Sequence, residues 1–363
     1  MNSYYPVLKI LSVITSLRVG GAERLLVDML PRLVEMGYQA DVYSFNNEDT
    51  PFAEKLTDAG LKICRHSAGG TYNVMHIIEL AKIMGQYDVV HSHNTSSQFF
   101  VAAAARLLRK PPLLVTTEHN TWNRRRAIPL AKYIDRWMYD TYDGIVGCSE
   151  KVRINLLKHI GGKRNISTIT NGINLSRLIR ANSENIQSGR DVIMTMVAGF
   201  RAQKDQPTIV RALCLLPENY IIQFVGTGAR EQEIRNLAEK LGVESRCRFL
   251  GIRTDIPDIL AKSDIFVFAS HYEGMPLALV EAMGAGLPIV ASDVDGICQL
   301  LKGDTGILFP DSNESLLAKA ILNLTQSPEL MKRYSEASVK KAAEYDIEKT
   351  AVSYIELYKK LMK

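Results

Sequence analysis

Short runs of β-branched and aromatic residues alternate with longer amphipathic stretches along the 363-residue chain. In its first half we expect strands at Lys9–Thr15, Gln39–Phe45, Val89–His91, Leu113–Thr117 and Gly144–Gly147. Amphipathic stretches such as Ala22–Met36 and Met75–Gly85 lie between these strands and predict helices. This alternation is typical of βαβ units, which build parallel sheets with helices packed on their faces. The pattern therefore predicts an α/β fold.

The pattern occurs twice. A polar segment without apolar periodicity follows Asn174, ends near Arg190 and predicts a linker. A second series of strands is expected at Asp191–Ala198, Tyr220–Val225, Cys247–Leu250, Ile265–Ala269 and Pro288–Ala291, before a charged amphipathic helix pair at Glu336–Lys363. Because single cores stop growing near about 250 to 300 residues, we expect two domains. Their expected bounds are residues 1–178 and 179–344, with residues 345–363 packed on the first domain.

Composition argues against several other classes of protein, including disordered, disulfide-rich and membrane-spanning proteins. Hydrophobic residues make up 46% and charged residues 23% of the chain, which is ordinary for a packed globular protein. The cysteines contain no CxxC pair, so neither a zinc site nor a disulfide framework is indicated, and a reducing compartment fits. Lys9 interrupts the first apolar run, which predicts a core strand instead of a signal peptide. No apolar run reaches the roughly 18 residues that a membrane span needs, so we expect a cytoplasmic protein.

Charge is unevenly distributed between the halves. Residues 1–180 contain 23 Lys and Arg against 15 Asp and Glu, a net charge of +8, whereas residues 181–363 have a net charge of −3. The excess is explained equally well by a solvated surface and by a patch that meets anionic phosphates or lipid headgroups. The second alternative predicts peripheral contact with the inner face of a membrane. We expect no nucleic-acid partner.

The most informative segment is the loop that follows the apolar strand ending at Ala269. The carboxyl ends of strands are where open α/β sheets bind ligands, which places Ser270 to Met275 at such a site. Pro276 is suited to be the first residue of a helix, whose free backbone N–H groups favour an anionic phosphate. Glu273 then lies in the loop and Glu281 within the helix, eight positions later. Taken singly, either carboxylate could be a surface charge.

This arrangement of two glutamates in a Ser, Glu-Gly, Pro loop resembles glycosyltransferase family 4, and the resemblance covers the C-terminal half well. It implies a GT-B fold, in which two Rossmann-like domains face each other across a cleft. It further implies that Glu273 contacts the donor sugar and that Glu281 accepts hydrogen bonds from the nucleotide ribose. Ionised carboxylates accept hydrogen bonds only, so they pair with sugar hydroxyls. The neighbouring donor-binding residues are Gly274, Met275, Pro276 and Leu277.

The first strand of the second half ends in a glycine turn followed by two cations. Gly199 lets the backbone approach a ligand closely, and Arg201 and Lys204 can both reach one diphosphate. The resemblance implies that the two cations stabilise the departing nucleoside diphosphate. Phe200 and the absence of glycine after Lys204 depart from the family pattern. The alternative is two ordinary surface cations.

Two further turns complete the donor side. Gly226 and Gly228 follow a strand, and the family places such a turn beside the diphosphate or base. Without a third glycine or a following acidic residue, the turn does not match the dinucleotide fingerprint of NAD enzymes. The backbone of Ile252 and Arg253 occupies the position where the family holds the base.

Candidates in the first half surround the ends of its strands. Gly20 and Gly21 form a turn that the resemblance places next to the donor phosphate and acceptor. The resemblance also puts His119 near the transferred sugar, as a catalytic residue with Arg201, Lys204 and Glu273. His91 and His93 are expected to be structural or acceptor-side, because metal binding needs ligands that the sequence does not supply.

Three consecutive arginines, Arg124, Arg125 and Arg126, follow His119. They are either a solvated charge run or an acceptor-side site for a phosphorylated or lipid-phosphate acceptor. The turn at 171–174 corresponds to the family's hinge between domains, with Asn174 in place of the common Asp. Its expected role is structural.

The implied reaction moves a sugar from a nucleoside-diphosphate sugar, with UDP favoured over GDP, to an acceptor hydroxyl with retention of configuration. The acceptor is a sugar or a polyprenyl-phosphate-linked glycan of bacterial surface polysaccharide or glycolipid synthesis. No cofactor and no metal are expected, since cations and helix dipoles can stabilise the leaving phosphate. The alternatives are a sugar-nucleotide-binding protein without turnover, and an epimerase or phosphorylase of the same fold.

Overall fold

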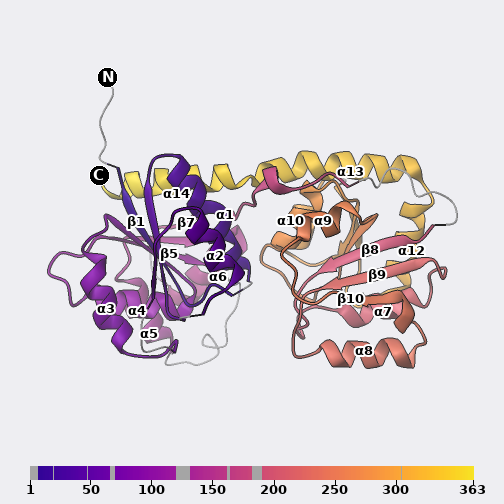
Figure 1. The fold of residues 1–363 in the computed structure, drawn as a ribbon, viewed down its shortest axis with the longest axis horizontal. Coiled ribbons are helices and arrows are strands. Elements are labelled where there is room, and N and C mark those ends of the chain that lie inside the picture. Colours follow the sequence, from indigo (N-terminus) through magenta and orange to yellow (C-terminus); the bar gives the residue numbers. More distant parts are fainter. Residues whose placement is uncertain are drawn as a thin grey trace, which may run out of the picture. The chain divides into compact units, whose positions relative to one another are not determined.

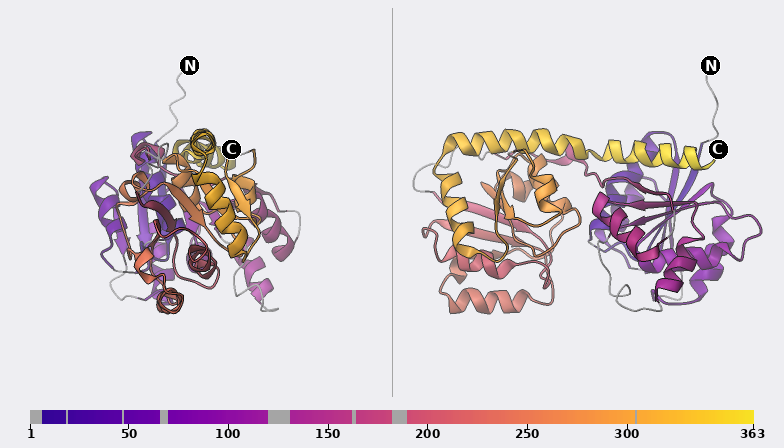
Figure 2. Two further views of the ribbon diagram at one scale, coloured as in Figure 1. Left: turned by 90° about the vertical axis from the view of Figure 1, so that its right-hand side faces the viewer. Right: turned by 180° about the vertical axis from the view of Figure 1, so that it is seen from behind.

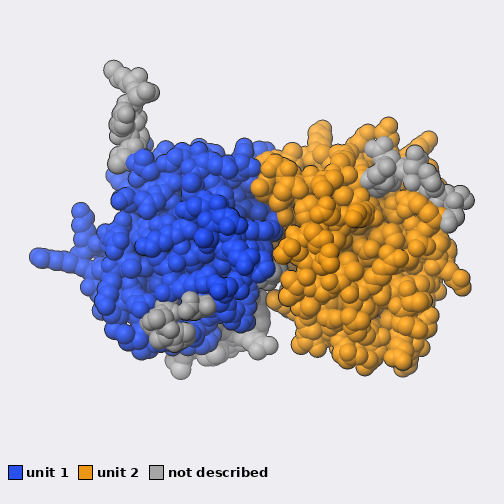
Figure 3. Space-filling model, in the orientation of Figure 1, with its two compact units in different colours: residues 1–172, 347–363 blue, residues 173–346 orange. Residues whose placement is uncertain are grey.

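A computed structural model of the chain divides into two compact units, residues 1–172 with 347–363 and residues 173–346 (Figure 1; Figure 3). The structure describes residues 7–18, 20–46, 48–65, 70–119, 131–161, 164–181, 190–303 and 305–363. Within these ranges no helix is long and apolar enough to cross a membrane. Each unit is an α/β sandwich built around one parallel sheet.

Unit 1 contains a seven-stranded sheet in the order β3-β2-β1-β4-β5-β6-β7, with every pair parallel. Its strands are β1 Lys9–Ile14, β2 Gln39–Ser44, β3 Ile63–Arg65, β4 Val89–His93, β5 Leu113–Glu118, β6 Gly144–Gly147 and β7 Ile166–Thr168. Its helices are α1 Gly21–Glu35, α2 Pro51–Asp58, α3 Met75–Met84, α4 Thr95–Ala105, α5 Ala131–Tyr139, α6 Glu150–Ile160 and α14 Ile347–Leu361.

The sheet of unit 1 is buried on both faces. Ile10 and Ile14 of β1 join a core with α1, α2 and α14, whereas Leu11 and Val13 join a second core with α3 to α6. Successive side chains of a strand point to opposite faces, so this division follows directly from the alternation along β1. Helices on both faces are what allow an all-parallel sheet to be stable.

Unit 2 contains a six-stranded parallel sheet in the order β10-β9-β8-β11-β12-β13. Its strands are β8 Val192–Val197, β9 Tyr220–Val225, β10 Cys247–Phe249, β11 Ile265–Phe268, β12 Ile289–Ser292 and β13 Ile307–Phe309. Its α-helices are α7 Gln206–Leu213, α8 Glu231–Lys240, α9 Ile256–Ala261, α10 Leu277–Gly284, α11 Ile297–Leu300, α12 Glu314–Thr325 and α13 Pro328–Ala342, with short 3₁₀ turns at Leu175–Arg177, Glu244–Arg246 and Ala343–Tyr345. Figures 1 and 2 show α8 as an outer helix, with α7 between it and the sheet.

The C-terminal helix α14 returns to unit 1. Tyr354 and Tyr358 of this helix are buried, and their hydroxyls bond Thr117 Oγ1 at 3.0 Å and His91 Nδ1 at 2.7 Å. The chain enters unit 2 at Ile173, whose backbone N–H donates to Tyr345 O at 2.9 Å. The sequence had placed this boundary at residue 178, and the return to the first domain at residue 345.

Candidate active site

The donor-side candidates of unit 2 lie where the strand order reverses. The chain runs outward from β8 through β9 to β10, then returns to place β11 on the other side of β8. Loops at the carboxyl ends of the two central strands flank a crevice at such a switch point, which is where open α/β sheets bind ligands. The loops after β8 and β11 are joined by backbone hydrogen bonds, Asp205 N to Ala269 O at 3.1 Å and His271 N to Gln203 O at 3.0 Å.

Lys204 and Glu273 meet between these loops. The Lys204 ammonium forms an ion pair with Glu273 Oε1, and its Nζ lies 4.6 Å from the centre of the Phe268 ring. Ser270 Oγ donates to the same carboxylate oxygen at 2.7 Å. Glu273 is 7% exposed, so its charge needs these partners. The structure thus brings two predicted catalytic side chains into direct contact.

Arg201 is the exposed cation of this cluster. In the described part of the chain its guanidinium makes no hydrogen bond or ion pair. Its Nε lies close to Gly199, 3.6 Å from the position that a Cβ would take there. A cation that has no such partner among the described residues, in the same loop as Lys204, is suited to bind an anionic ligand.

Helix α10 begins one residue later than the sequence predicted. Pro276 has extended backbone angles (φ −76°, ψ 102°) and is the N-cap, so Leu277 is the first helical residue. The ψ value explains the difference, because residues of an α-helix have ψ near about −40° and Pro276 does not. No side chain of the described residues caps this end, so its first N–H groups are available to a ligand.

Glu281 lies inside α10, as predicted, and is 7% exposed. Its carboxylate forms an ion pair with Arg177, from the 3₁₀ turn at Leu175–Arg177. Sequence reasoning missed Arg177, because it had interpreted this polar segment as a linker. The only available signal was a cation within a segment that corresponds to the family's hinge.

The glycine turns pack backbone against backbone. Gly226 has φ +136°, its N–H donates to Gly251 O at 2.8 Å, and a Cβ there would lie 2.3 Å from Ala198 O. A Cβ at Gly228 would lie 2.3 Å from Phe200 O. The turn after β9 is therefore held against the turn that carries Gly199, with no space for a side chain. Gly296 was missed by the sequence, and a Cβ there would lie 2.6 Å from Glu273 O.

Ile252 and Arg253 follow β10 on the surface. Ile252 is 61% exposed, and Arg253 pairs with both carboxylate oxygens of Asp255 at 2.8 and 2.6 Å. The Arg253 side chain is thus engaged within its own loop. The base contact expected here concerns the backbone, and it stays a prediction.

In unit 1 the reversal of strand order lies between β1 and β4. Gly20 is the N-cap of α1 with an extended φ of −164°, and Gly21 is its first residue. Neither glycine adopts a positive φ, so the pair is not required by turn geometry. A Cβ at Gly20 would instead collide with Glu23 Oε2, which lies 2.2 Å from that position.

The histidines divide into His91, which is held by two hydroxyl partners, and the pair His93 and His119, which contact each other. His91 is fully buried and bonds Thr117 Oγ1 at 2.8 Å as well as Tyr358. His93 Nδ1 lies 3.2 Å from His119 Nε2, and Asn171 Nδ2 lies 3.5 Å from His119 Nδ1. His93 is also fully buried, yet its Nε2 has no partner within the described residues.

Burial sets the protonation of these rings. Loss of solvent lowers the pKa of His91 to about 3 and that of His119 to about 4, and it lowers the pKa of His93 well below its ordinary range. The neighbouring histidines lower the pKa values of His91 and His93 further. His119 is therefore neutral at pH 7 and can act as a hydrogen-bonding group but not as a cation. Arg124, Arg125 and Arg126 lie outside the described residues.

Comparisons with known proteins agree with this geometry. Residues 19–177 match the family Glycosyltransferase Family 4, and residues 180–341 match Glycosyl transferases group 1. The putative glycosyltransferase EpsD of Bacillus subtilis is 24% identical over 90% of this chain and 91% of its own length. UDP-Gal:alpha-D-GlcNAc-diphosphoundecaprenol alpha-1,3-galactosyltransferase of Escherichia coli is 31% identical over 44% of this chain and 45% of that enzyme.

A solved structure shares the fold. Anabaena Alr3699/HepE in complex with UDP and glucose superposes with a TM-score of 0.85 over 96% of this chain and 99% of its own, at 19% identity. The predicted GT-B fold of two Rossmann-like halves is confirmed. The chain belongs to glycosyltransferase family 4, and it is a glycosyltransferase of the GT-B type.

Proposed function

We propose that the chain transfers a sugar from a UDP-sugar to a hydroxyl of a glycan acceptor, with retention of configuration and without a metal at the phosphates. The proposal rests above all on the ion pair between Lys204 and Glu273 at the carboxyl ends of β8 and β11, with Arg201 in the same loop as Lys204. Cations placed where charge develops on a leaving diphosphate stabilise the transition state more than the ground state.

Each side chain has a chemically suited role in this scheme. Arg201 binds the diphosphate, and Lys204 turns toward it when the donor enters. Glu273 then loses its contact with Lys204 and accepts hydrogen bonds from the sugar hydroxyls. These hydrogen bonds keep the buried carboxylate of Glu273 partnered. Neutral His119 bonds the sugar from unit 1. Glu281 accepts hydrogen bonds from the ribose hydroxyls, and Arg177 neutralises the negative charge of the Glu281 carboxylate.

The UDP-sugar donor is supported by two relatives. HepE binds UDP-glucose in a solved structure, and the Escherichia coli enzyme acts with UDP-Gal on a diphosphoundecaprenol-linked acceptor. We infer a similar sugar or polyprenyl-linked glycan acceptor for this chain, in the synthesis of a surface polysaccharide or glycolipid.

Contact with a membrane would suit such an acceptor. Helices α4 and α5 pack together. Tyr133 and Trp137 of α5 are exposed, as are Arg106, Leu107 and Arg109, which directly follow α4. Arg106 lies 4.2 Å from the centre of the Trp137 ring. Cations interleaved with aromatic and aliphatic side chains fit an anionic lipid surface. We propose that this α4–α5 patch contacts anionic phospholipid at the inner face of the membrane.

Acceptor-dependent release of nucleoside diphosphate tests the function. Thermal-shift screening against UDP-, GDP- and ADP-sugars first selects the donor, because a ligand of the folded state raises the unfolding temperature. We then expect UDP release to require an added acceptor. Donor binding without release in the presence of acceptors would instead indicate a binding protein, and sugar isomerisation without acceptor would indicate an epimerase.

A further inference from the structure

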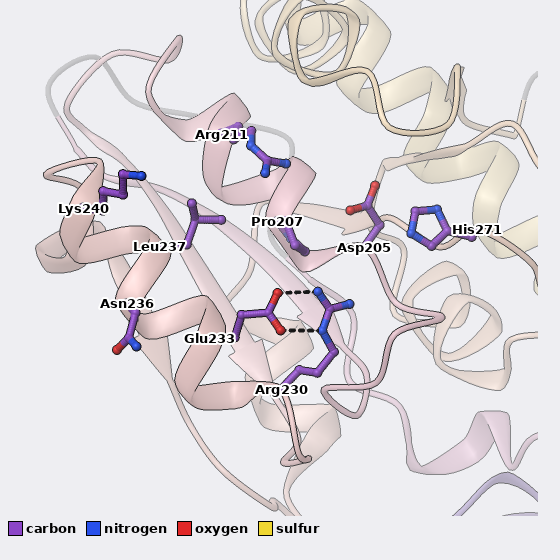
Figure 4. A pocket seen from close by; sticks show the side chains of 9 residues that line it. All are labelled: Asp205, Pro207, Arg211, Arg230, Glu233, Asn236, Leu237, Lys240 and His271. Carbon is purple, nitrogen blue, oxygen red and sulfur yellow. Dashed lines mark hydrogen bonds and ion pairs between the residues drawn. The ribbon is translucent and has the colours of Figure 1, made fainter.

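A second cluster of polar side chains lies on unit 2 beside the donor loops. Asp205, His271 and Asp311 follow β8, β11 and β13, and one nitrogen or oxygen atom from each lies within 4.8 Å of the other two. Asp205 and His271 also line a cavity of about 410 Å³ that opens beside α7 and α8 (Figure 4). Lys204 and Glu273 are not among its lining residues, so the cluster is separate from the ion pair described above.

Asp205 carries an unused acceptor. The residue is 5% exposed, and its Oδ1 accepts from Thr208 N at 3.4 Å as the N-cap of α7. Its Oδ2 is buried and has no hydrogen-bond partner among the residues that the structure describes. Arg230, a cation that lines the same cavity, donates two hydrogen bonds to Glu233 at 2.7 and 2.5 Å (Figure 4). A buried carboxylate oxygen without a partner is costly, so a ligand there would be stabilised.

His271 and Asp311 already have nearly the spacing of two ligands on one metal ion. The Nδ1 atom of His271 lies 3.0 and 3.1 Å from the two carboxylate oxygens of Asp311. Ligand atoms on a tetrahedral Zn²⁺, each about 2.0 to 2.2 Å from the ion, are separated by roughly 3.3 Å. Without an ion, the His271 N–H donates to Asp311. With one, the ring would take its other tautomer and offer the Nδ1 lone pair.

We propose that Asp205, His271 and Asp311 bind one divalent transition-metal ion of the Zn²⁺ type. Imidazole with carboxylates is a suitable ligand set for such an ion, and three protein ligands leave a fourth position for water. Asp205 would need to approach the other two ligand atoms by at most about 1.5 Å to complete the geometry, because all three atoms lie within 4.8 Å of one another. The cavity gives solvent, and hence the ion, a path to the buried Asp205 oxygen.

The ion would cross-link the loops that carry the donor-binding residues. Asp205 is next to Lys204 in the chain, and His271 is two residues before Glu273. Joining these two loops to the end of β13 would reduce their freedom to separate. The ion has a positioning role in this proposal, and it touches neither phosphate nor sugar. The inference is independent of the proposed transfer reaction.

Metal titration of the full chain tests the site. Cys214 is exposed and could bind Zn²⁺ adventitiously, so the background is Cys214→Ser. After dialysis against a chelator, we expect calorimetry to show one Zn²⁺ per chain and the unfolding temperature to rise on addition. Mg²⁺ should not substitute, because it prefers octahedral oxygen sites.

The ligand variants decide the assignment. His271→Ala and Asp311→Asn should each weaken Zn²⁺ binding by at least about tenfold, whereas Asp258→Asn, an exposed carboxylate of α9, should not. The Co²⁺ form should show visible d–d absorption that His271→Ala abolishes. The proposal is overturned if no stoichiometric binding occurs, or if His271→Ala binds as tightly as the parent. Cooperative urea unfolding of the metal-free variants verifies that each of them is folded.

Discussion

The Lys204 ammonium, in the loop after β8, forms an ion pair with the Glu273 carboxylate, in the loop after β11. Both side chains are largely buried, with 15% and 8% of their surfaces exposed. The exposed Arg201 lies three residues from Lys204. Removal of Lys204 should therefore affect the stability of the fold more than removal of Arg201. In the proposed mechanism both cations bind the same diphosphate.

We expect Arg201→Ala to lower turnover by orders of magnitude and to leave the unfolding temperature unchanged. The guanidinium makes no hydrogen bond or ion pair within the described residues, and a cation that binds the leaving phosphate acts mainly in the transition state. Steady-state kinetics with donor and acceptor measure the effect. Arg248→Ala, another exposed arginine of unit 2, is the matched control and should retain activity.

Lys204→Ala should lower both turnover and stability. It leaves the Glu273 charge buried with Ser270 as a neutral partner, which costs about 1 to 3 kcal/mol of unfolding free energy. Lys204→Ala/Glu273→Gln should recover part of this stability without recovering turnover. Near-normal activity in both Arg201→Ala and Lys204→Ala would contradict the assignment of these cations.

Substitutions of the two glutamates should have separate effects on nucleotide binding and on sugar transfer. We expect Glu281→Gln to weaken binding of the bare nucleoside diphosphate by about ten- to a hundredfold, since a charged acceptor of a hydroxyl contributes roughly 1.5 to 3 kcal/mol. Glu273→Gln should spare this binding and depress sugar transfer. Calorimetry with UDP and transfer assays with the UDP-sugar measure the two effects. Equal loss of nucleotide affinity in both variants would rule out the proposed division.

Long, strongly patterned elements could be predicted from the sequence, whereas three of the four three-residue strands at the sheet edges could not; the fourth, β10, corresponds to the strand predicted at Cys247–Leu250. The strands predicted in the first half correspond to β1, β2, β4, β5 and β6. Three strands of three residues each, β3, β7 and β13, were missed, and all of them are at the edge of a sheet. An edge strand is kept short in many proteins, so it carries too few residues to show a period of two.

The candidate site was predictable where residue type alone determines the chemistry. Glu273, Lys204 and Arg201 were identified as a group, and the structure places the first two in contact. Arg177 could not be found, because its partner Glu281 is 104 positions away and only the fold brings them together. Gly296 could not be found either, since its role is to leave space for the backbone of Glu273.

Chelation should leave transfer intact. In the proposed mechanism Arg201, Lys204 and the start of α10 stabilise the leaving diphosphate, so turnover at low temperature should survive EDTA. The unfolding temperature should fall if the inferred Zn²⁺ site is occupied before chelation. Complete loss of activity on chelation, restored by Mn²⁺ or Mg²⁺, would show that a metal acts at the phosphates.

Gly228→Ala should disrupt the donor side through the backbone alone. The added Cβ would lie 2.3 Å from Phe200 O, so the two turns must move apart. We expect a loss of roughly 1 to 3 kcal/mol of unfolding free energy and a weaker affinity for UDP. Gly85→Ala is the control, because a Cβ at Gly85 meets nothing within 4 Å and its φ is −65°. Equal behaviour of the two variants in urea unfolding would contradict the close packing of the turns.

The buried histidines of unit 1 should make the protein less stable as the pH falls from about 7 toward 5. In the unfolded chain a histidine binds a proton near its ordinary pKa of about 6.5, whereas the folded pKa values of His91 and His119 are about 3 and 4. Between these values the unfolded state holds more protons, so unfolding is favoured by up to about 1.4 kcal/mol per pH unit for each histidine. Stability is complete above the unfolded pKa and is lost as the pH falls toward the folded one.

Unfolding temperatures measured from pH 5 to 8 test this linkage. His91→Gln removes one of the titrating groups, so its stability should fall less steeply with acidification than that of the parent, even if the variant is less stable at pH 8. If His91→Gln and the parent show the same dependence on pH, the low pKa of His91 in the folded state is wrong, and the ring is protonated within its buried contacts with Thr117 and Tyr358.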